Sequence, residues 1–530
     1  MSRASRFEAN LLFLVSALLA PCAALAEQAS PAPAAAAIYT EHCASCHGAD
    51  PLGGTRPALN TKTLARLKKD AAAATIAKGR PATQMPAFSD KLSAEAMKSV
   101  AEYIYQPLAS VPKWGREEIE ASRVVVEKAP ELARPEFAAD PLNLFVVVEA
   151  GDHHVTILDG DTFTPMTRFA SRFALHGGPK FTPDGRFVFF MSRDGWVTKY
   201  DLWRLKVVAE VRAAINARNI AMSKDGKHLA VANYLPHTLV ILSAEDLSLE
   251  RIFDVADRQG QSSRVSAVYQ NPIRNSFIVA LKDIAEVWEV ATDPDAPPVY
   301  GSFVHSRQPG LEEGIPDDPG GLFARRRISL PEPLDDFYFD PSYTSILGAS
   351  RDGTKALVLD LDVRKVIATI DLPGMPHLGS GISWKRDGRR VMATPHLKGS
   401  KLSIIDLADW KVVRTIDMDG PGFFLRSHEK SRYAWADAMM GPTAKDTMLL
   451  VDKETLEVAQ RLKPMPGKTA AHVEFDRYGR HALVSIWEKD GALVVYDTET
   501  LKEVKRLAMS KPSGKYNVYN KINFEEGTSH

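Results

Sequence analysis

Two cysteines and a histidine, Cys43, Cys46 and His47, have the spacing C-x-x-C-H. In this arrangement both thiols can add to the vinyl groups of a porphyrin, and the adjacent imidazole becomes an axial ligand of the iron. A redox-active or zinc-binding pair of cysteines is the alternative. The histidine that follows, and the presence of only one other cysteine in the chain, Cys22, favour the haem. The motif therefore predicts one covalently attached haem c.

A second axial ligand is expected some tens of residues downstream, and Met85 in TQMPAF is the candidate. A thioether ligand raises the reduction potential of the iron and suits electron transfer. His42 is a weaker candidate because it is too close to Cys43 to reach the opposite face of the macrocycle. Ser93 is predicted to cap a helix over AEAMKSVAEYIYQ, whose apolar spacing would pack against the haem edge. This segment resembles a class I cytochrome c, which carries one electron at a time.

The N-terminus has the pattern of a targeting segment. Arg3 and Arg6 precede the apolar run LLFLVSALLAPCAALA, which ends in a small-x-small cleavage site at Ala26. The run is too short for a comfortable membrane span. Cleavage after Ala26 would remove Cys22, and Pro21 disfavours a lipoprotein interpretation of that cysteine. We predict export, in a bacterium to the periplasm, and no membrane span elsewhere.

Length and composition indicate a globular protein of more than one domain. The chain has 530 residues, and 66 basic residues balance 66 acidic ones. This zero net charge gives no electrostatic reason to expect nucleic acid or an anionic membrane as partner. The predicted domains are a signal peptide (1–26), a class I cytochrome c domain (27–112), a linker (113–135) and a repeat domain (136–530).

One unit recurs from about residue 140 to the C-terminus: a small-residue entry, a strand, a turn, and two or three further strands. The turns read TPDGR, SKDGK, WKRDGR and FDRYGR, with less regular versions between them. We count eight units, spaced mostly by about 41–48 residues with one interval near 70. Period and strand content are typical of propeller blades, so we predict an all-β eight-bladed propeller after an all-α cytochrome c domain. The long interval holds a Pro/Gly-rich insertion at about 296–328, a candidate lid or docking surface.

The register of the repeats places four side chains at one mouth of the central channel. They are His176 in LHGG, Arg218 in NARN, His377 in PHLGSG and His472 in AAHVEF. His176 and His377 belong to units two and six, which face each other across an eight-fold ring. Glycines beside them let backbone approach closely. Two such histidines would hold a flat metal macrocycle between them, whereas His396, His428 and His481 are predicted to be structural.

A cytochrome c domain joined to a propeller with these histidines resembles the cytochrome cd1 family, whose propeller binds haem d1 non-covalently. The resemblance runs from Cys43 to about Asn520. The motifs that carry it are the LHGG histidine, the YDLW segment at 200–203, the NAR segment, the PHLGSG histidine and the closing GKYNVYN. It implies that His176 and His377 are the axial ligands of haem d1 iron.

Two activities occur within that family. Nitrite reductases of the cd1 type use a proximal histidine and two distal histidines that protonate nitrite. His176 matches the proximal residue and His377 one distal residue. The other distal histidine would lie before the fifth blade, where this chain reads PEPLDDFYFD with Asp335 and Asp336 instead. Release of water from nitrite needs two well-placed protons, so this departure argues against nitrite reduction.

The dihydro-haem d1 dehydrogenase (NirN-type) group fits the chain better, since its closing segment is similar to GKYNVYNKINFEEGTSH. The resemblance implies removal of two electrons and two protons from a propionate side chain to form the acrylate of haem d1, with haem c as electron acceptor. His472 and Tyr516 are then candidates for proton abstraction; Tyr516 is alternatively a strand residue that seals the last blade. Arg193 and Arg218 are candidate partners of the macrocycle carboxylates.

Other interpretations stay open on the sequence alone. A haem d1 carrier would need the axial histidines but neither His472 nor Tyr516, and its haem c would have no evident purpose. A plain interaction propeller would bind no second cofactor. Expected partners are the tetrapyrrole, an external electron acceptor and a cd1 nitrite reductase that receives the product.

Overall fold

The protein is seen here in a computed structural model that describes residues 32–48, 50–53, 58–61, 64, 67–79, 85–107, 113–175, 178–300, 316–524 and 526–527. The predicted signal peptide, His176 and part of the insertion lie outside these residues. Within the described residues no helix is long and apolar enough to cross a bilayer.

The N-terminal part of the chain is helical. Its helices are α1 (Ala32–His42), α2 (Ala44–His47), α3 (Lys69–Lys78), α4 (Ala94–Ile104) and α5 (Arg116–Ser122). Helix α4 begins at the predicted cap, because the Ser93 side chain accepts a hydrogen bond from the Ala96 amide at 3.2 Å. Its apolar face, which includes Val100 and Ile104, is buried, as the spacing predicted.

The segment predicted as a linker contains regular structure. Besides α5 it holds the short strand β1 (Val124–Val125), which pairs antiparallel with an outer propeller strand so that Val124 lies opposite Glu210. The Ile119 side chain on α5 is fully buried against the propeller core. The connection is therefore packed onto the propeller along part of its length.

The strands of the described residues form eight sheets, named blades 1–8 in the order in which they follow along the chain. Blade 1 has β33 (Pro512–Asn517), β2 (Phe145–Glu149), β3 (His154–Asp159) and β4 (Thr164–Ala170). Blade 2 has β5 (Lys180–Phe181), β6 (Phe187–Met191), β7 (Trp196–Asp201), β8 (Lys206–Arg212) and β1. Blade 3 has β9 (Asn216–Met222), β10 (His228–Leu235), β11 (Thr238–Ser243) and β12 (Leu249–Asp254). Blade 4 has β13 (Val265–Asn271), β14 (Ser276–Leu281), β15 (Glu286–Ala291) and β16 (Arg325–Ser329).

The second half of the ring repeats the pattern. Blade 5 has β17 (Leu334–Phe339), β18 (Ser345–Ser350), β19 (Lys355–Asp360) and β20 (Lys365–Asp371). Blade 6 has β21 (Ile382–Arg386), β22 (Arg389–Pro395), β23 (Lys401–Asp406) and β24 (Lys411–Asp417). Blade 7 has β25 (Leu425–Arg426), β26 (Tyr433–Asp437), β27 (Met448–Asp452) and β28 (Val458–Leu462). Blade 8 has β29 (Ala470–Phe475), β30 (His481–Ile486), β31 (Gly491–Asp497) and β32 (Glu503–Met509).

The eight-bladed propeller predicted from the repeats is thus confirmed. The ring closes through β33, which pairs antiparallel with β2 and places Tyr516 opposite Val146. The alternative interpretation of Tyr516 was a strand residue that seals the last blade. In the structure Tyr516 instead completes the first blade. Joining the first and last parts of the propeller in one sheet covers strand edges that would otherwise stay open.

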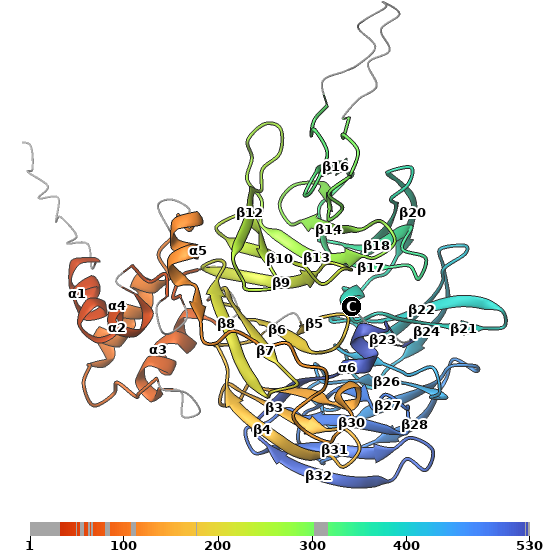
Figure 1. Cartoon of the computed structure of the whole chain (residues 1–530). Helices are drawn as coiled ribbons and strands as arrows, with labels where there is room; N and C mark the ends of the chain where they lie inside the picture. The colour runs from red at the N-terminus through yellow and green to blue at the C-terminus, as the bar shows by residue number, and fades with distance from the viewer. Residues whose placement is uncertain are drawn as a thin grey trace, which may run out of the picture.

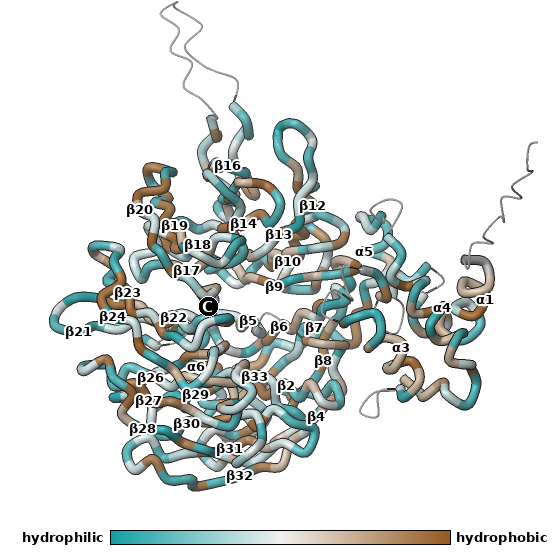
Figure 2. The backbone as a smooth tube through the Cα atoms, turned by 180° about the vertical axis from the view of Figure 1, so that it is seen from behind, coloured by the Kyte–Doolittle hydropathy of each residue, from teal (hydrophilic) through white to brown (hydrophobic). Residues whose placement is uncertain are grey.

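The first strand of each blade after blade 1, together with β33, surrounds the central channel (Figure 1). The short helix α6 (Val518–Ile522) follows β33 and lies near the centre of the ring in Figure 1. Its Asn520 and Lys521 share a cavity with Ala221 and Met222, which end β9, so α6 lies at the end of the channel where these inner strands end. Two short 3-10 segments, η1 (Pro141–Asn143) and η2 (Leu378–Ser380), precede β2 and β21. The helical domain lies beside blades 2 and 3 in both views (Figure 1, Figure 2).

Candidate functional site

The haem-attachment motif forms a single helical turn. Cys43 caps α2, and the His47 amide donates to the Cys43 carbonyl at 2.9 Å. Cys43 and Cys46 are free thiols and form no disulfide, and burial raises the pKa of the Cys43 thiol to about 11. The two thiols and the imidazole therefore share one turn, as attachment of a porphyrin requires.

Met85 lies on the same side of the helical domain. It is partly buried and packs against the apolar cluster that includes Ile76 and Phe88, which Cys43 also contacts. The weaker candidate, His42, has its ring 6.2 Å from that of Phe88. This donor set fits a covalent haem with one imidazole and one thioether ligand, and the ligand roles stay predictions.

His377 is the best defined of the predicted channel ligands. It directly precedes η2 in blade 6, and its Nδ1 lies 2.7 Å from the carbonyl oxygen of Phe423. A carbonyl accepts only, so Nδ1 carries the proton and Nε2 keeps a free lone pair. Burial lowers the pKa of His377, although Asp336 opposes this. The imidazole is therefore neutral and suited to ligate a metal through Nε2.

The glycine beside His377 has a steric reason. A Cβ atom at Gly379 would lie 2.3 Å from Asp336 Oδ2, so the carboxylate can approach the backbone of η2 only because no side chain is there. Asp336 also accepts from the Tyr269 hydroxyl at 3.0 Å, whereas Asp335 forms a salt bridge with Lys282. The two aspartates noted in the sequence thus differ in their surroundings: Asp336 lies beside the candidate ligand.

Two phenylalanines connect the candidate histidines. The Phe423 ring lies 4.2 Å from that of His377, and the Phe424 ring lies 4.7 Å from that of His472. The backbone amides of both phenylalanines donate to the carboxylate of Asp437, at 2.8 and 3.1 Å. Asp437 is fully buried, and burial raises its pKa to about 6. Phe423 and Phe424 therefore link the two histidines, because one ring packs on His377 and the other packs on His472.

His472 lies within β29, third in the strand and not before it, at a β-bulge where its φ is 48°. Its side chain is 1% exposed. The buried Lys515 ammonium donates to the His472 carbonyl and lies 3.4 Å from its Nδ1 and 2.9 Å from Ser485 Oγ. Burial, and next to it the Lys515 charge, lowers the pKa of His472 well below its usual range. His472 is a neutral, enclosed imidazole.

Tyr516 lies between His472 and the segment that carries the predicted proximal histidine. Its ring is edge-on to that of His472, 5.5 Å away. A Cβ atom at Gly178 would be 3.4 Å from the Tyr516 ring, and Gly178 is two residues after His176. Burial raises the pKa of Tyr516 to about 12, and the Arg426 charge opposes this. Tyr516 is only half-buried, so it is the more accessible of the two predicted acid–base residues.

The two predicted carboxylate partners lie on neighbouring blades. Arg193 is in the turn after β6, where its amide donates to the Ala174 carbonyl at 3.1 Å and its carbonyl accepts from the Ala217 amide at 3.1 Å. Arg218 lies within β9, with Tyr234 and Asp336 in electrostatic range. The structure thus places Arg193 beside the segment that precedes His176. Arg218 directly follows Ala217, the residue whose amide bonds Arg193.

Several channel residues could not be recognised from the sequence. Arg426 on β25, Lys515 on β33 and Lys521 on α6 are single basic residues in strands or a helix, without a motif around them. Their inward position depends on the strand register of each blade. For Lys515 the alternation along β33 was a usable signal, because Tyr516 was already a candidate.

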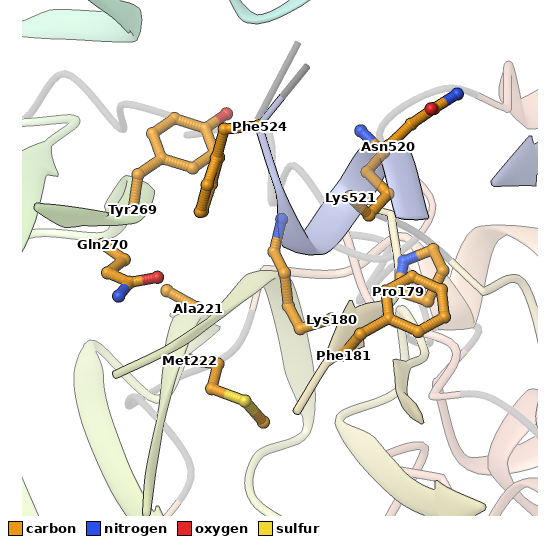
Figure 3. A pocket seen from close by; sticks show the side chains of 10 residues that line it. All are labelled: Pro179, Lys180, Phe181, Ala221, Met222, Tyr269, Gln270, Asn520, Lys521 and Phe524. Carbon is orange, nitrogen blue, oxygen red and sulfur yellow. The ribbon is translucent and has the colours of Figure 1, made fainter. Parts of the chain in front are cut away.

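A small cavity of about 70 Å³ lies at the α6 end of the channel (Figure 3). Lys180 and Lys521 line it together with Tyr269, Asn520 and Phe524. Its lining includes none of the candidate iron ligands or acid–base residues, so we do not assign the predicted macrocycle to this cavity.

Comparison with known proteins covers both parts of the chain. Residues 139–302 and 321–521 match the family described as Cytochrome D1 heme domain, and residues 30–104 match the family described as Cytochrome C oxidase, cbb3-type, subunit III. The chain is 54% identical over 504 residues to a dihydro-heme d1 dehydrogenase of Pseudomonas aeruginosa (strain PAO1), covering 95% of this chain and 97% of that protein. It is 26% identical over 573 residues to a nitrite reductase of Stutzerimonas stutzeri, covering 97% of each.

A solved structure is also similar. It is described as dihydro-heme d1 dehydrogenase NirN in complex with DHE, and it matches with a TM-score of 0.85 and 53% sequence identity. The match covers 93% of this chain and all of that chain, 100%. The similarity therefore includes the helical domain, the propeller and the channel between His377 and Tyr516.

Proposed function

Because the chain belongs to the family of proteins with a cytochrome d1 haem domain, we propose that it is a dihydro-haem d1 dehydrogenase. The reaction converts a propionate side chain of a bound tetrapyrrole into an acrylate. Two C–H bonds are broken, one C=C bond is formed, and two protons and two electrons leave. The protein whose name states this activity is 54% identical over nearly the whole chain.

Haem c supplies one-electron acceptance when it is attached. Cys43 and Cys46 would hold it covalently, and His47 and Met85 would ligate its iron. Each turnover releases two electrons, so a one-electron centre held by these residues would need an external one-electron acceptor for the reaction to be completed. This demand gives the fused cytochrome a role that a mere tetrapyrrole carrier would not need.

The tetrapyrrole is held between blades 2 and 6. His377 would ligate its iron through Nε2, since Nδ1 is engaged by the Phe423 carbonyl at 2.7 Å. His176, which lies outside the described residues, would ligate from the opposite blade. The orientation of His377 is the observation that carries the proposal.

Proton removal is assigned to the edge near blades 1 and 8. Tyr516 is half-buried and His472 is enclosed behind it, at 1% exposure. We therefore propose that Tyr516 contacts the propionate chain and that His472 supports it from behind. Arg193 and Arg218 are proposed partners for carboxylates on the side of the macrocycle nearest blades 2 and 3.

Nitrite reduction is the less favoured activity. The position expected for a second proton-donating histidine is occupied by Asp335 and Asp336. Asp335 is paired with Lys282, and Asp336 accepts a hydrogen bond from Tyr269. Both carboxylates are therefore engaged with other side chains, and neither replaces the second histidine of a cd1 nitrite reductase.

We further propose that the protein works in the periplasm and delivers its product to a cd1 nitrite reductase. The N-terminal apolar run preceded by Arg3 and Arg6 supports export, and c-type haem attachment fits that compartment. The product is a cofactor with no use on this chain once formed. The insertion at about 296–328 is a candidate docking surface for the protein that receives it.

The experiment is anaerobic incubation of the haem c-loaded protein with dihydro-haem d1. Conversion to a product two mass units lighter, with haem c reduced, is the expected result. A Tyr516→Phe variant should bind the tetrapyrrole, with an unchanged absorption spectrum, but convert it much more slowly. Binding without conversion by the wild-type protein would instead support a carrier, and reduction of nitrite by the loaded protein would support the reductase.

A further inference from the structure

Arg426 is a buried guanidinium in the channel wall. It lies on β25 at 4% exposure, its Nη1 donates to the Leu425 carbonyl at 2.9 Å, and its Nε has no hydrogen-bond partner among the described residues. Arginine keeps its charge even when burial lowers its pKa, as it does here. A buried charge without a counter-ion is costly, and proteins normally pair it. The unfilled hydrogen-bonding capacity therefore suggests that an anion binds here.

Glu474, the nearest carboxylate, does not fill this role. Its Oε1 accepts from the Phe475 amide and from Asn520 Nδ2, each at 3.1 Å, and its Oε2 has no partner in the described part of the chain. No salt bridge within 4.0 Å joins it to Arg426 among the described residues. Lys515 and Lys521 also lie near Arg426, and burial lowers the pKa of both. A lysine side chain has no acceptor and no negative charge, so neither lysine compensates the Arg426 guanidinium.

The arginines predicted from the sequence are in a different electrostatic setting. Arg218 has Tyr234, Asp336 and Asp335 in range, which raise its pKa against the effect of burial. Its charge is therefore offset by the protein itself. Arg426 has only Glu474 and Tyr516 as opposing groups, and burial outweighs both. An incoming carboxylate would gain more from pairing with Arg426 than from pairing with Arg218.

Arg426 also lies close to the groups assigned to proton removal. Besides burial, its charge acts on the pKa of His377, of His472 and of Tyr516, so Arg426 lies within electrostatic range of all three. Arg426 is two residues after Phe424, whose ring packs on His472. Arg426 does not line the cavity beside α6 (Figure 3). We therefore expect a carboxylate that reaches Arg426 to come from the side of the channel where the tetrapyrrole is proposed to bind.

Resting on the proposed function, we propose that Arg426 binds the carboxylate of the propionate that is dehydrogenated. A propionate has two carbons between its carboxylate and the ring. With the carboxylate on Arg426, those two carbons pass beside Tyr516, where their hydrogens must be removed. Arg426 is then both the anchor that selects this side chain and a group that touches the reacting atoms.

The guanidinium would also stabilise the negative charge that develops during proton removal. Taking a proton from the carbon next to a carboxylate places a second negative charge on that group, which water alone stabilises poorly. A paired guanidinium neutralises the first charge and stabilises the second as it develops. The balance is –CH2–CH2–COO⁻ to –CH=CH–COO⁻ with release of two protons and two electrons. The electrons go singly to ferric haem c, which an external one-electron acceptor such as ferricyanide reoxidises.

Arg426→Gln in the haem c-loaded full-length protein tests the proposal. The matched control is Arg414→Gln, which removes an arginine that is 53% exposed on the outer strand β24. Conversion of dihydro-haem d1, followed by mass and by haem c reduction, should fall about 10²–10³-fold in Arg426→Gln, the range found when one donor to a developing oxyanion is lost. The control should convert at the wild-type rate.

Stability and a substrate analogue keep the test independent of misfolding. Removing an uncompensated buried charge should leave the melting temperature of Arg426→Gln unchanged or raised, whereas a structural arginine would lower it. Wild-type protein given the tetrapyrrole with that propionate methylated should convert it about 10²-fold or more slowly than the free acid. Conversion by Arg426→Gln at the control rate, or equal rates for ester and acid, would overturn the proposal. Failure of wild-type protein to convert the free acid would instead overturn the proposed function.

Discussion

Replacing Arg212 with methionine should loosen the attachment of the helical domain to the propeller. Arg212 ends β8, is 3% exposed, and donates from Nη2 to the Leu52 carbonyl at 2.9 Å and from Nη1 to the Gly53 carbonyl at 3.4 Å. Its Nε donates to the Asp194 carbonyl at 2.9 Å within the propeller. Its guanidinium lies 4.7 Å from the ring of Trp114. One side chain thus joins the segment after the haem motif to blade 2.

The size of the effect follows from these contacts. A hydrogen bond from a charged donor contributes about 1.5–3 kcal/mol, and the longer bond and the cation–π contact add less. Burial lowers the pKa of Arg212, so its charge carries a desolvation cost that methionine removes. A net loss of about 2 kcal/mol in docking free energy is therefore expected, which corresponds to about a 30-fold shift in the docking equilibrium.

Hydrogen–deuterium exchange measures this shift directly, because exchange of interface amides reports the free energy of local opening. The Arg212→Met protein should exchange amides in 50–61 and 114–122 about 30-fold faster than wild type. Haem c should be reduced more slowly after the tetrapyrrole is added, with tetrapyrrole affinity unchanged. The control is Arg116→Gln in α5, whose side chain is 59% exposed and paired with Glu120. Equal exchange in the two variants would refute a docking role for Arg212.

Three further outcomes are expected. Tyr516→Phe should slow conversion more than His472→Ala, since His472 is enclosed behind it; comparison of single-turnover rates decides this, and the reverse order would contradict the assignment. His377→Ala should weaken tetrapyrrole binding and change its absorption spectrum, whereas an unchanged spectrum would exclude Nε2 ligation. Burial lowers the pKa of His396 and of His428, so the unfolded chain takes up protons below pH 6.5 that the folded chain does not. The unfolding free energy should thus keep its full value above pH 6.5 and decrease as the pH falls below 6.5, by at most about 1.4 kcal/mol per pH unit for each histidine. Equal urea midpoints at pH 7.5 and pH 5.5 would contradict this expectation.

The parts of the fold that follow local rules were predictable. The turns TPDGR and FDRYGR mark the blades because their glycines adopt positive φ, 72° at Gly185 and 69° at Gly479. The cap at Ser93 and the C-x-x-C-H turn depend only on neighbours within a few residues. Closure of the ring was not local: β33 pairs with β2 across most of the chain, so Tyr516 was assigned to the wrong blade. The predicted domain boundaries and ligand roles stay predictions.

The candidate site also contains some residues that the sequence identifies and others that only long-range packing defines. Glycine-flanked histidines can be recognised by type and position, as His377 was, with Gly379 needed for the close approach of Asp336. Arg426 is different, because its importance lies in what surrounds it: burial, an unpartnered Nε and a carboxylate, Glu474, bonded elsewhere. None of these properties is encoded near residue 426. Long-range packing alone creates a buried uncompensated charge, and no sequence pattern reports it.

A continuous chain of bonds runs from the haem motif, through the interface between the helical domain and blade 2, to the propeller channel. The Gly53 amide donates to the His47 carbonyl at 2.8 Å, and Arg212 bonds the Gly53 and Asp194 carbonyls. Asp194 is covalently joined to Arg193, whose amide donates to the Ala174 carbonyl at 3.1 Å, two residues before His176.

The predicted axial histidine of haem c is therefore linked to that of the tetrapyrrole by covalent bonds and four hydrogen bonds. We expect electrons that follow this route to leave the channel on the side of blade 2, where Arg193 lies. The candidate acid–base residues Tyr516 and His472 lie on blades 1 and 8. Such a route would give an enzyme of this kind a reason to keep its cytochrome docked at blades 2 and 3.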